Sequence, residues 1–430
     1  MAVLKEPVIL GIDFGTSNSS TSVNINGEVK LIDVDGCNLS NKKVLRSVIY
    51  FNNEEKKFFV GQEAVEMYIE NDASGRYIQS IKSFLPDKSF HRTEIGGRYY
   101  SLDDLIALVL RKIKEAGEGI SKREIKDVVL GRPVFFSNDP DTDKFAEKRL
   151  LLAAKKAGFE NIQLQYEPIA AALDYESALK EGDEKIVLVG DFGGGTSDFA
   201  IVRVNNGKQK AKRDRKSDVL SIGGVYIGGD VFDSRIMWEK VAKYFGKDVR
   251  IKALMADFTL GMPSPIMNKL RRWHLIPLLQ TPKTRQIISE IKHQADRRDL
   301  VENLERLIDC NYGYMLFRSI EKSKCELSSQ EETNISFDGI NLSLKERITR
   351  LEFEEIILKE IEEINSCVVS TMREASLSPE KIDAVFLTGG SSLIPCIKRI
   401  FEDKFGQDKI NQVNAFTSVA YGLGLSVSSV

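Results

Sequence analysis

Two aspartates each follow an apolar run and precede a phenylalanine and a glycine. Asp13 lies in "VILGIDFGTSNS", and Asp191 lies in "IVLVGDFGGGTSDF", where three consecutive glycines separate two strand-like segments. Glycine loses much conformational entropy on folding, so three in one predicted hairpin indicate that something approaches the bare backbone closely. Successive backbone N–H groups in such a turn bind anions, and carboxylate oxygens suit Mg²⁺. The pattern therefore favours a phosphate and magnesium site, with a flexible loop and ordinary turn aspartates as the alternatives.

The two aspartates belong to a repeated pattern. Residues 8–32 and 187–210 each contain an apolar strand, Asp-Phe-Gly, a threonine, a second strand and an Asn-Gly that indicates a tight hairpin. Downstream of each, the hydrophobic period predicts an amphipathic helix, a buried strand, a second helix, a short strand and a small-residue helix. We predict two similar α/β halves, each a sheet under helices, with a ligand in the cleft between them.

Composition excludes several classes of protein. The 430 residues suffice for about two to three domains, and 61 basic against 63 acidic residues give a formal charge of −2, which does not favour nucleic-acid binding. The basic stretch 207–216 falls where a solvated hairpin loop is expected. Five scattered cysteines and three histidines form no metal-binding pattern, and no apolar run resembles a signal peptide or a spanning helix. We therefore expect a cytoplasmic protein without a structural metal and without membrane or nucleic-acid partners.

A series of motifs resembles the actin-like ATPases, a superfamily that includes sugar kinases, bacterial filament proteins and heat shock protein 70 chaperones. The similarity is greatest to the nucleotide-binding domain of heat shock protein 70 (DnaK-type) chaperones. The motifs follow the family order along nearly the whole chain: "GIDFGTSNS", "LRSVIYF", "SIKSF", "RPVFFSND", "YEPIAAALDY", "DFGGGTSDF", "IGGDVFD", "EKSKCELSS" and "LTGGSSLIP". The resemblance implies an α/β actin-like ATPase fold, with two duplicated ribonuclease-H-like lobes around a nucleotide cleft.

The resemblance also implies a division of the chain. Lobe I is expected over 1–184, with an outer subdomain at about 39–124, and is completed by 410–430. Lobe II is expected over 185–409, with an enlarged outer subdomain at about 232–347.

The chain departs from the usual chaperone pattern in two places. After "YGLGLSVSSV" the family's linker, peptide-binding β-domain and helical lid do not follow, and about 245–315 is an insertion. This combination resembles the truncated YegD-like branch. It predicts that extended client peptides are not held in the usual groove. The insertion falls where nucleotide-exchange partners of the family usually bind, so a co-chaperone of unknown identity remains a possible partner.

The resemblance assigns the reaction to a small set of residues. Lys82 is expected to reach the γ-phosphate and stabilise charge during transfer, while Asp13 and Asp191 hold Mg²⁺ through water. The alternative for Lys82 is a solvated surface lysine. The expected catalytic residues are Lys82, Asp13, Glu167, Asp191, Thr196 and Asp198.

Two of these catalytic residues have a second interpretation. Glu167 precedes Pro168 at a predicted helix start, so it contacts the water shell of the metal or serves as a helix N-terminal charge. Asp198 either orients a catalytic water or holds the turn. The residues expected to surround the phosphates are Gly15, Thr16, Ser17, Asn18, Gly193, Gly194, Gly195, Gly228 and Gly229.

The nucleoside is expected to contact a helix and a glycine turn. Glu321, Lys324 and Ser328 have spacings that place them on one helical face, which the family uses for the ribose and the adenine edge. A charged pair on the surface is the alternative. Gly389, Gly390 and Ser391 follow a predicted strand and are expected to open a helix whose N-terminus suits the nucleotide.

From these features we expect a stand-alone chaperone-type nucleotide-binding domain that binds ATP or ADP with Mg²⁺ and hydrolyses ATP slowly. A small-molecule kinase of the sugar type would need a substrate acid or base in the cleft, and no motif supplies one. The motifs are also compatible with a filament-forming actin-like protein and with a nucleotide-bound regulatory module without turnover.

Overall fold

The first predicted hairpin opens a sheet whose strands run in the order β11-β10-β1-β2-β3, with the short β4 beside β2. The structure is a computed structural model that describes residues 8–71, 74–205, 218–252, 258–339, 341–412 and 417–426. Asn26 and Gly27 connect β2 to β3 with positive φ angles, as predicted for an Asn-Gly turn. The strands are β1 (Val8–Phe14), β2 (Asn18–Ile25), β3 (Glu28–Leu31), β4 (Val44–Arg46), β10 (Asp127–Arg132) and β11 (Asn161–Tyr166).

The second predicted hairpin opens a sheet with the matching order β14-β13-β12-β19-β20. In each sheet the first strand pairs antiparallel with its hairpin partner and parallel with a later strand. The repeated order of strands and helices confirms the predicted duplication, although the second Asn-Gly turn and the basic stretch 207–216 lie outside the described residues. The strands are β12 (Glu184–Phe192), β13 (Ser197–Asn205), β14 (Val219–Val225), β19 (Ala384–Thr388) and β20 (Ile410–Gln412).

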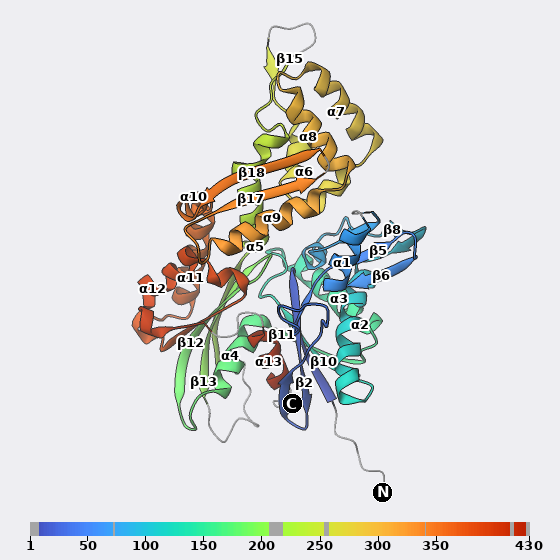
Figure 1. Ribbon diagram of the computed structural model, residues 1–430. Helices are drawn as coiled ribbons and strands as arrows, with labels where there is room; N and C mark the ends of the chain where they lie inside the picture. The colour runs from blue at the N-terminus through green and yellow to red at the C-terminus, as the bar shows by residue number, and fades with distance from the viewer. Residues whose placement is uncertain are drawn as a thin grey trace. The chain divides into compact units, whose positions relative to one another are not determined.

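The predicted small-residue helices are α4 (Glu167–Ser177) and α13 (Ser418–Leu425), which pack against each other beside strands of both sheets (Figure 1). Their contact is close, because a Cβ on Gly422 would lie 1.7 Å from the carbonyl oxygen of Ala170. The Oγ of Ser22 in β2 donates a 2.6 Å hydrogen bond to a main-chain carbonyl of α13. Only small side chains allow the two helices to pack at this separation.

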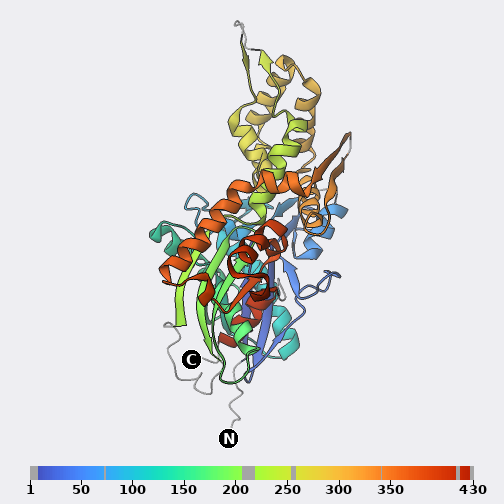
Figure 2. The ribbon, with the colours of Figure 1, turned by 90° about the vertical axis from the view of Figure 1, so that its left-hand side faces the viewer.

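Longer helices pack on the sheets. α2 (Leu102–Ser121) and α3 (Pro140–Lys156) lie on the first sheet, and their apolar residues join its core. Figure 2 shows α11 (Leu358–Glu374) across the strands of the second sheet, where α12 (Pro395–Phe405) also packs. α2 begins at a capping box formed by Ser101, which satisfies N–H groups that the first turn leaves unpaired.

Between β4 and α2, the chain forms smaller elements that belong to the same unit. β5, β6 and β7 form a sheet in the order β6-β5-β7, and β8 pairs with β9. A 3₁₀ turn, η1, follows β7 and packs on α2. The bounds are β5 (Ile49–Asn52), β6 (Lys57–Val60), α1 (Gln62–Glu70), β7 (Arg76–Ile78), η1 (Ile81–Phe84), β8 (Thr93–Ile95) and β9 (Arg98–Tyr100).

Residues Asp230–Ile361 form a compact unit of their own, and Met1–Gly229 with Glu362–Val430 form the other. In the smaller unit, α9 packs on the hairpin β17-β18, and α7 packs against α8. The predicted outer subdomain, about 232–347, falls inside this unit, while the predicted lobe boundaries stay a prediction. The elements are α5 (Gly229–Ile236), η4 (Met237–Val241), η5 (Ala242–Phe245), β15 (Ile251–Lys252), β16 (Thr259–Leu260), α6 (Ser264–Leu270), η6 (Trp273–Leu279), α7 (Pro282–Gln294), α8 (Arg298–Asp309), α9 (Gly313–Glu326), β17 (Glu332–Gly339), β18 (Leu342–Thr349) and α10 (Arg350–Ile356).

Candidate functional site

The turns of the two duplicated hairpins lie next to each other in the larger unit. A Cβ added to Gly195 would lie 3.2 Å from the Oγ1 of Thr16, so the second turn contacts the first. Gly15 starts the first turn, where a Cβ would lie 2.0 Å from the carbonyl oxygen of Asn18. The structure therefore brings together residues 15–18 and 193–196, including Ser17, as two adjoining half-buried turns.

A third loop closes on the glycine run. A Cβ on Gly228 would lie 2.5 Å from the carbonyl oxygen of Gly194, and the N–H of Gly229 donates a 3.1 Å hydrogen bond to the carbonyl of Gly193. None of Gly193, Gly194 and Gly195 has a positive φ. Three consecutive glycines are thus explained by close approach of other main chain rather than by an unusual backbone conformation.

Lys82 is buried against Glu167 beside these turns. Its Nζ lies 2.7 Å from the Oε1 of Glu167, and the two residues are 8% and 5% exposed. Burial alone would lower the pKa of Lys82, but the carboxylates of Glu167, Asp13 and Asp198 raise it. The predicted surface alternative for Lys82 is therefore wrong, because the ammonium group is buried and paired.

Three aspartates join this pair. Asp13 and Asp191 are the next-to-last residues of β1 and β12, and Asp198 stands opposite Asp191 in the β12-β13 hairpin. Burial and the neighbouring carboxylate of Glu167 raise the pKa of Asp13 and of Asp198 to about 7, and raise the pKa of Asp191 well above its usual value. Four carboxylates thus surround the single ammonium of Lys82 in this cluster, and their mutual repulsion favours the arrival of a cation.

Asp198 is held by hydrogen bonds from main chain and side chain. The N–H of Val134 donates to its Oδ1 at 3.0 Å, and the side chain of Thr196 also donates to it. A Cβ on Gly224 would lie 2.8 Å from the same oxygen. The carboxylate therefore has a fixed position, and no motif had indicated that Val134 supplies the donor.

Arg132 anchors the segment that carries this donor. Its guanidinium binds Asp143 at 2.9 Å and also binds Glu147, both on α3, and it packs over the ring of Tyr166. Asp143 in turn accepts a 2.6 Å hydrogen bond from the N–H of Phe136. The turn after β10 is thus tied to α3 on both sides of Val134.

The turn after β19 carries Gly389, Gly390 and Ser391. Gly389 has φ 81°, and a Cβ there would lie 2.2 Å from the carbonyl oxygen of Phe192, so only glycine fits. Gly390 opens a 3₁₀ turn, η8 (Gly390–Leu393), and α12 begins at Pro395. The helix predicted at these residues therefore begins as a 3₁₀ turn, and α12 follows it. The Oγ of Ser391 donates a 3.5 Å hydrogen bond to the carbonyl of Gly193.

In the smaller unit, Lys324 forms a second buried pair. Its Nζ lies 2.9 Å from the Oδ2 of Asp233, and both residues are less than a tenth exposed. Burial opposes ionisation of Lys324, but Asp233 and Glu321 raise its pKa. Glu321 lies half-buried on α9, and Ser328 lies in the turn behind the helix, which ends at Glu326. The expected helical face therefore holds for Glu321 and Lys324 alone.

The described residues contain no group of side chains that could bind a metal ion directly. Among them, no three histidine, cysteine, aspartate or glutamate side chains are close enough to hold an ion directly. Within the same residues, no helix is both long and apolar enough to span a membrane.

Comparison with known proteins identifies the family. A family model described as Hsp70 protein matches residues 80–259 and 292–428 of this chain. The chain belongs to the Hsp70 family. Its fold is therefore that of the actin-like ATPases, and the resemblance noted from the motifs is confirmed.

Chaperones of this family match nearly the whole chain. The Chaperone protein DnaK of Thermosipho africanus (strain TCF52B) is 28% identical over 431 residues, which cover 99% of this chain and 59% of the relative. The Chaperone protein DnaK of Thermotoga neapolitana is 28% identical over 432 residues, with 99% and 60% covered. The chain thus spans about three fifths of the length of these relatives. The Hsp70 family model leaves out residues 260–291, which lie inside the predicted insertion.

Proposed function

We propose that this Hsp70-family chain binds ATP or ADP with Mg²⁺ and hydrolyses ATP slowly. The observation that carries the proposal is the cluster of Asp13, Glu167, Asp191 and Asp198 around Lys82, next to the glycine turns. Lys82, Glu167 and Asp198 are buried in it, and Asp13 and Asp191 are half-buried. A cluster with more carboxylates than cations favours a bound cation, and turn N–H groups favour a bound anion. A magnesium nucleotide supplies both charges.

Asp13 and Asp191 are the proposed holders of the metal, through water. Each lies one residue before the end of a strand in one of the two duplicated sheets, and the charge of Asp13 contributes to the raised pKa of Asp191. Mg²⁺ in nucleotide sites keeps several waters and is held by one or two carboxylates, which fits this pair. When bound, the ion would offset charge on the phosphate oxygens.

Lys82 is proposed to contact the γ-phosphate. Its raised pKa keeps the ammonium protonated at neutral pH, and Glu167 holds the amine in one position. A fixed ammonium stabilises the charge that develops on the transferred group without rearranging during the reaction.

Asp198 is proposed to orient the attacking water and to accept its proton. Its pKa of about 7 is suited to accepting a proton at neutral pH. Thr196 and the N–H of Val134 donate to this carboxylate and so orient it. Gly15, Thr16, Ser17, Asn18, Gly193, Gly194, Gly195, Gly228 and Gly229 are proposed to surround the phosphates.

Glu321, Lys324, Ser328, Gly389, Gly390 and Ser391 are proposed to recognise the nucleoside. Lys324 is held by Asp233, so its ammonium has a defined place on α9. We further propose that the chain acts in the cytoplasm and works with a protein partner of the co-chaperone kind, as members of its family do.

A single-turnover ATPase assay on the purified chain, with a panel of sugars beside it, tests the proposal. We expect slow ADP formation that needs Mg²⁺ and does not depend on any sugar. Phosphorylated sugar would support the kinase alternative, and sedimentation with ATP would support the filament alternative. Tight binding by calorimetry without any turnover would support the regulatory module.

A further inference from the structure

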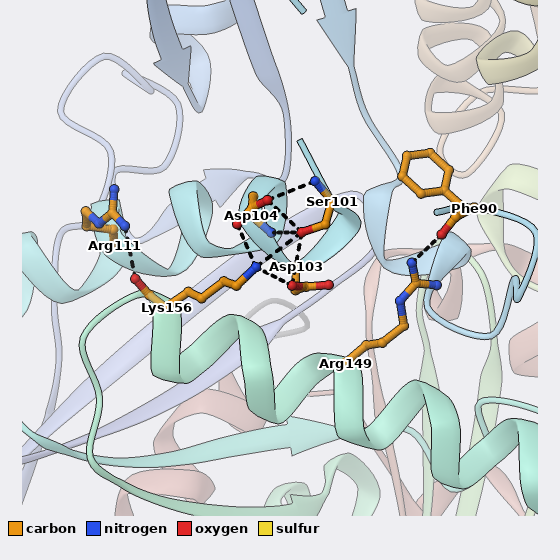
Figure 3. A network of polar contacts seen from close by, with 7 residues as sticks. All are labelled: Phe90, Ser101, Asp103, Asp104, Arg111, Arg149 and Lys156. Atoms are coloured by element: carbon orange, nitrogen blue, oxygen red, sulfur yellow. Dashed lines mark hydrogen bonds and ion pairs between the residues drawn. The ribbon is translucent and has the colours of Figure 1, made fainter. Parts of the chain in front are cut away.

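Helix α3 carries a buried arginine that binds a run of main-chain carbonyls. Arg149 is 9% exposed, and its Nη1 donates to the carbonyls of Phe84, Leu85 and Asp87 at 3.2, 3.3 and 2.9 Å. Its Nη2 donates to the carbonyl of Phe90 at 2.6 Å, the contact drawn in Figure 3. One guanidinium therefore ties together the whole segment 84–90.

Burying the charged guanidinium of Arg149 costs free energy, so its hydrogen bonds must offset that cost. Burial lowers the pKa of Arg149, opposed by the charges of Asp103 and Asp87. In the part of the chain that the structure describes, its hydrogen bonds go to main-chain carbonyls and to no carboxylate. Within segment 84–90, main-chain hydrogen bonds run from Asp87 to Phe84 and from Phe90 to Asp87, and the N–H and Oγ of Ser89 donate to the Oδ1 of Asp87. None of these bonds connects the segment to α3. Because a buried carbonyl without a donor is destabilising, the guanidinium determines the path of this segment.

The segment continues directly from the turn that holds Lys82. η1 starts after Ser80, a buried residue with φ 51°, and the N–H of Leu85 donates to the carbonyl of Lys82 at 3.1 Å. From this turn Lys82 reaches Glu167. A shift of segment 84–90 would therefore move the main chain from which the ammonium extends.

We propose that Arg149 is a positioning residue for Lys82. By holding the carbonyls of segment 84–90, it fixes the 3₁₀ turn from which the Lys82 ammonium reaches its site. The consequence for turnover rests on the proposed ATPase function, whereas the consequence for the geometry of Lys82 does not.

Lys156, on the same helix, provides a matched control. Its Nζ donates to the Oγ of Ser101 at 3.2 Å and to Asp104 at 2.7 Å, and it also binds Asp103 (Figure 3). These contacts join α3 to the start of α2 and do not involve segment 84–90. Lys156→Met thus removes a cation from the α2–α3 contact without removing a donor to the Lys82 turn.

The first test measures how accessible Lys82 is to an amine-acylating reagent, with peptide mass spectrometry as the readout. Arg149→Met should raise the acylation rate of Lys82 about tenfold, as loss of buried hydrogen bonds does to a local opening equilibrium. Amide hydrogen exchange should rise over residues 81–90 as well. Lys156→Met should leave both quantities at the wild-type level. Wild-type acylation in Arg149→Met, or an equal rise in Lys156→Met, would overturn the proposal.

Arg149→Lys keeps the test decisive if Arg149→Met does not fold. A single ammonium cannot reach all the carbonyls that the guanidinium fork binds, so acylation of Lys82 should lie between that of the wild type and that of Arg149→Met. Acylation of Lys82 in Arg149→Lys at the wild-type rate would contradict a positioning role.

The second test measures single-turnover hydrolysis. Arg149→Met should lower turnover about 10²-fold, the effect of a small misplacement of a catalytic group, while nucleotide affinity changes only a few-fold. Arg149→Lys should recover part of the rate, and Lys156→Met should keep it. If the wild-type chain does not hydrolyse ATP, the proposed function fails, and the acylation experiment still decides the position of Lys82.

Discussion

The Lys82–Glu167 and Lys324–Asp233 pairs, one in each unit, look alike by distance and burial but have different electrostatic surroundings. Lys82 lies 2.7 Å from Glu167, Lys324 lies 2.9 Å from Asp233, and all four side chains are nearly inaccessible. After burial, the largest influence on Asp13 and on Asp198 is another carboxylate, that of Glu167. For Asp233 it is its own lysine partner.

This difference defines two kinds of buried lysine: Lys82 is shared among several carboxylates, and Lys324 is paired mainly with one. The ammonium of Lys82 is the positive charge nearest to several carboxylates that repel one another. The cluster therefore has an excess of negative charge, which a bound cation can neutralise. Lys324 is mainly committed to Asp233, and the pair ties α9 to α5. Burial and a short distance alone therefore do not identify a catalytic lysine, whereas an excess of carboxylates around it does.

The largest expected effect is the loss of ATP turnover when the shared lysine, Lys82, is replaced. Lys82→Met should lower ATP turnover by about 10²–10³-fold, as removal of a fixed electrostatic donor does, while nucleotide affinity falls much less. Lys324→Met, the matched variant, should weaken nucleotide binding and leave turnover at saturating nucleotide unchanged. Single-turnover rates over a nucleotide titration separate the two. Equal losses of turnover in both variants would remove the distinction between the pairs.

The next effect concerns stability and pH in the nucleotide-free chain. The pKa of Asp198 is raised from 3.8 to about 7 in the folded chain, so between these values the folded chain keeps a proton that the unfolded chain has lost. The free energy of unfolding therefore falls as pH rises from about 4 to about 7, and the loss is complete above pH 7.

Asp198→Asn cannot ionise and should avoid this loss. We expect no gain in stability near pH 4 and a gain of about 2–4 kcal/mol above pH 7. Urea unfolding at a series of pH values measures it. If the stability of Asp198→Asn depended on pH as strongly as that of the wild type, the ionisation of Asp198 would not be the cause of the loss.

A smaller effect is expected from the ligand. Magnesium ATP at a hundredfold excess over its dissociation constant should stabilise the chain by about 2.7 kcal/mol. Asp191→Asn should lose the part of this stabilisation, and of turnover, that EDTA removes from the wild type. Thermal unfolding with and without EDTA provides the measurement. Unchanged magnesium dependence in Asp191→Asn would argue against a metal held at the end of β12.

The smallest expected effect is on stability, when both partners of the Lys324–Asp233 pair are made neutral. Replacing a buried ion pair by neutral groups of similar size is often nearly neutral, so Lys324→Met with Asp233→Asn should change stability by about 1 kcal/mol or less. Lys82→Met with Glu167→Gln should leave the aspartates without a cation and abolish turnover. If the Lys324 double variant also lost turnover per bound nucleotide, the second pair would share the role of the first.

Local patterns in the sequence predicted the hairpins, their order and the small-residue helices. Asn26-Gly27 needs positive φ angles, and the glycines after Asp13 and Asp191 leave room for neighbouring main chain and side chains. Few residue types meet either requirement, so short motifs predict these features. The support around the site was not predictable in this way. Arg149 and Val134 act through main-chain carbonyls and an N–H, which nearly every residue carries, so no residue type marks the partner. Asp233 is 91 positions from Lys324, and only the fold brings them together.

The contact between α13 and β2 has a consequence for how the chain is made. Ser22 donates its hydrogen bond to Ala420, 398 positions later, and α13 packs on both β1 and β2. At a synthesis rate of about 5–20 residues per second, the interval between these two residues is roughly 20–80 s. When β11, the last strand of the first sheet, has been made at Tyr166, the sheet still lacks α13, which packs on β1, β2, β3 and β10. This nascent chain, itself a member of a chaperone family, therefore leaves the α13-binding side of β1 and β2 uncovered until residues 418–425 have been made.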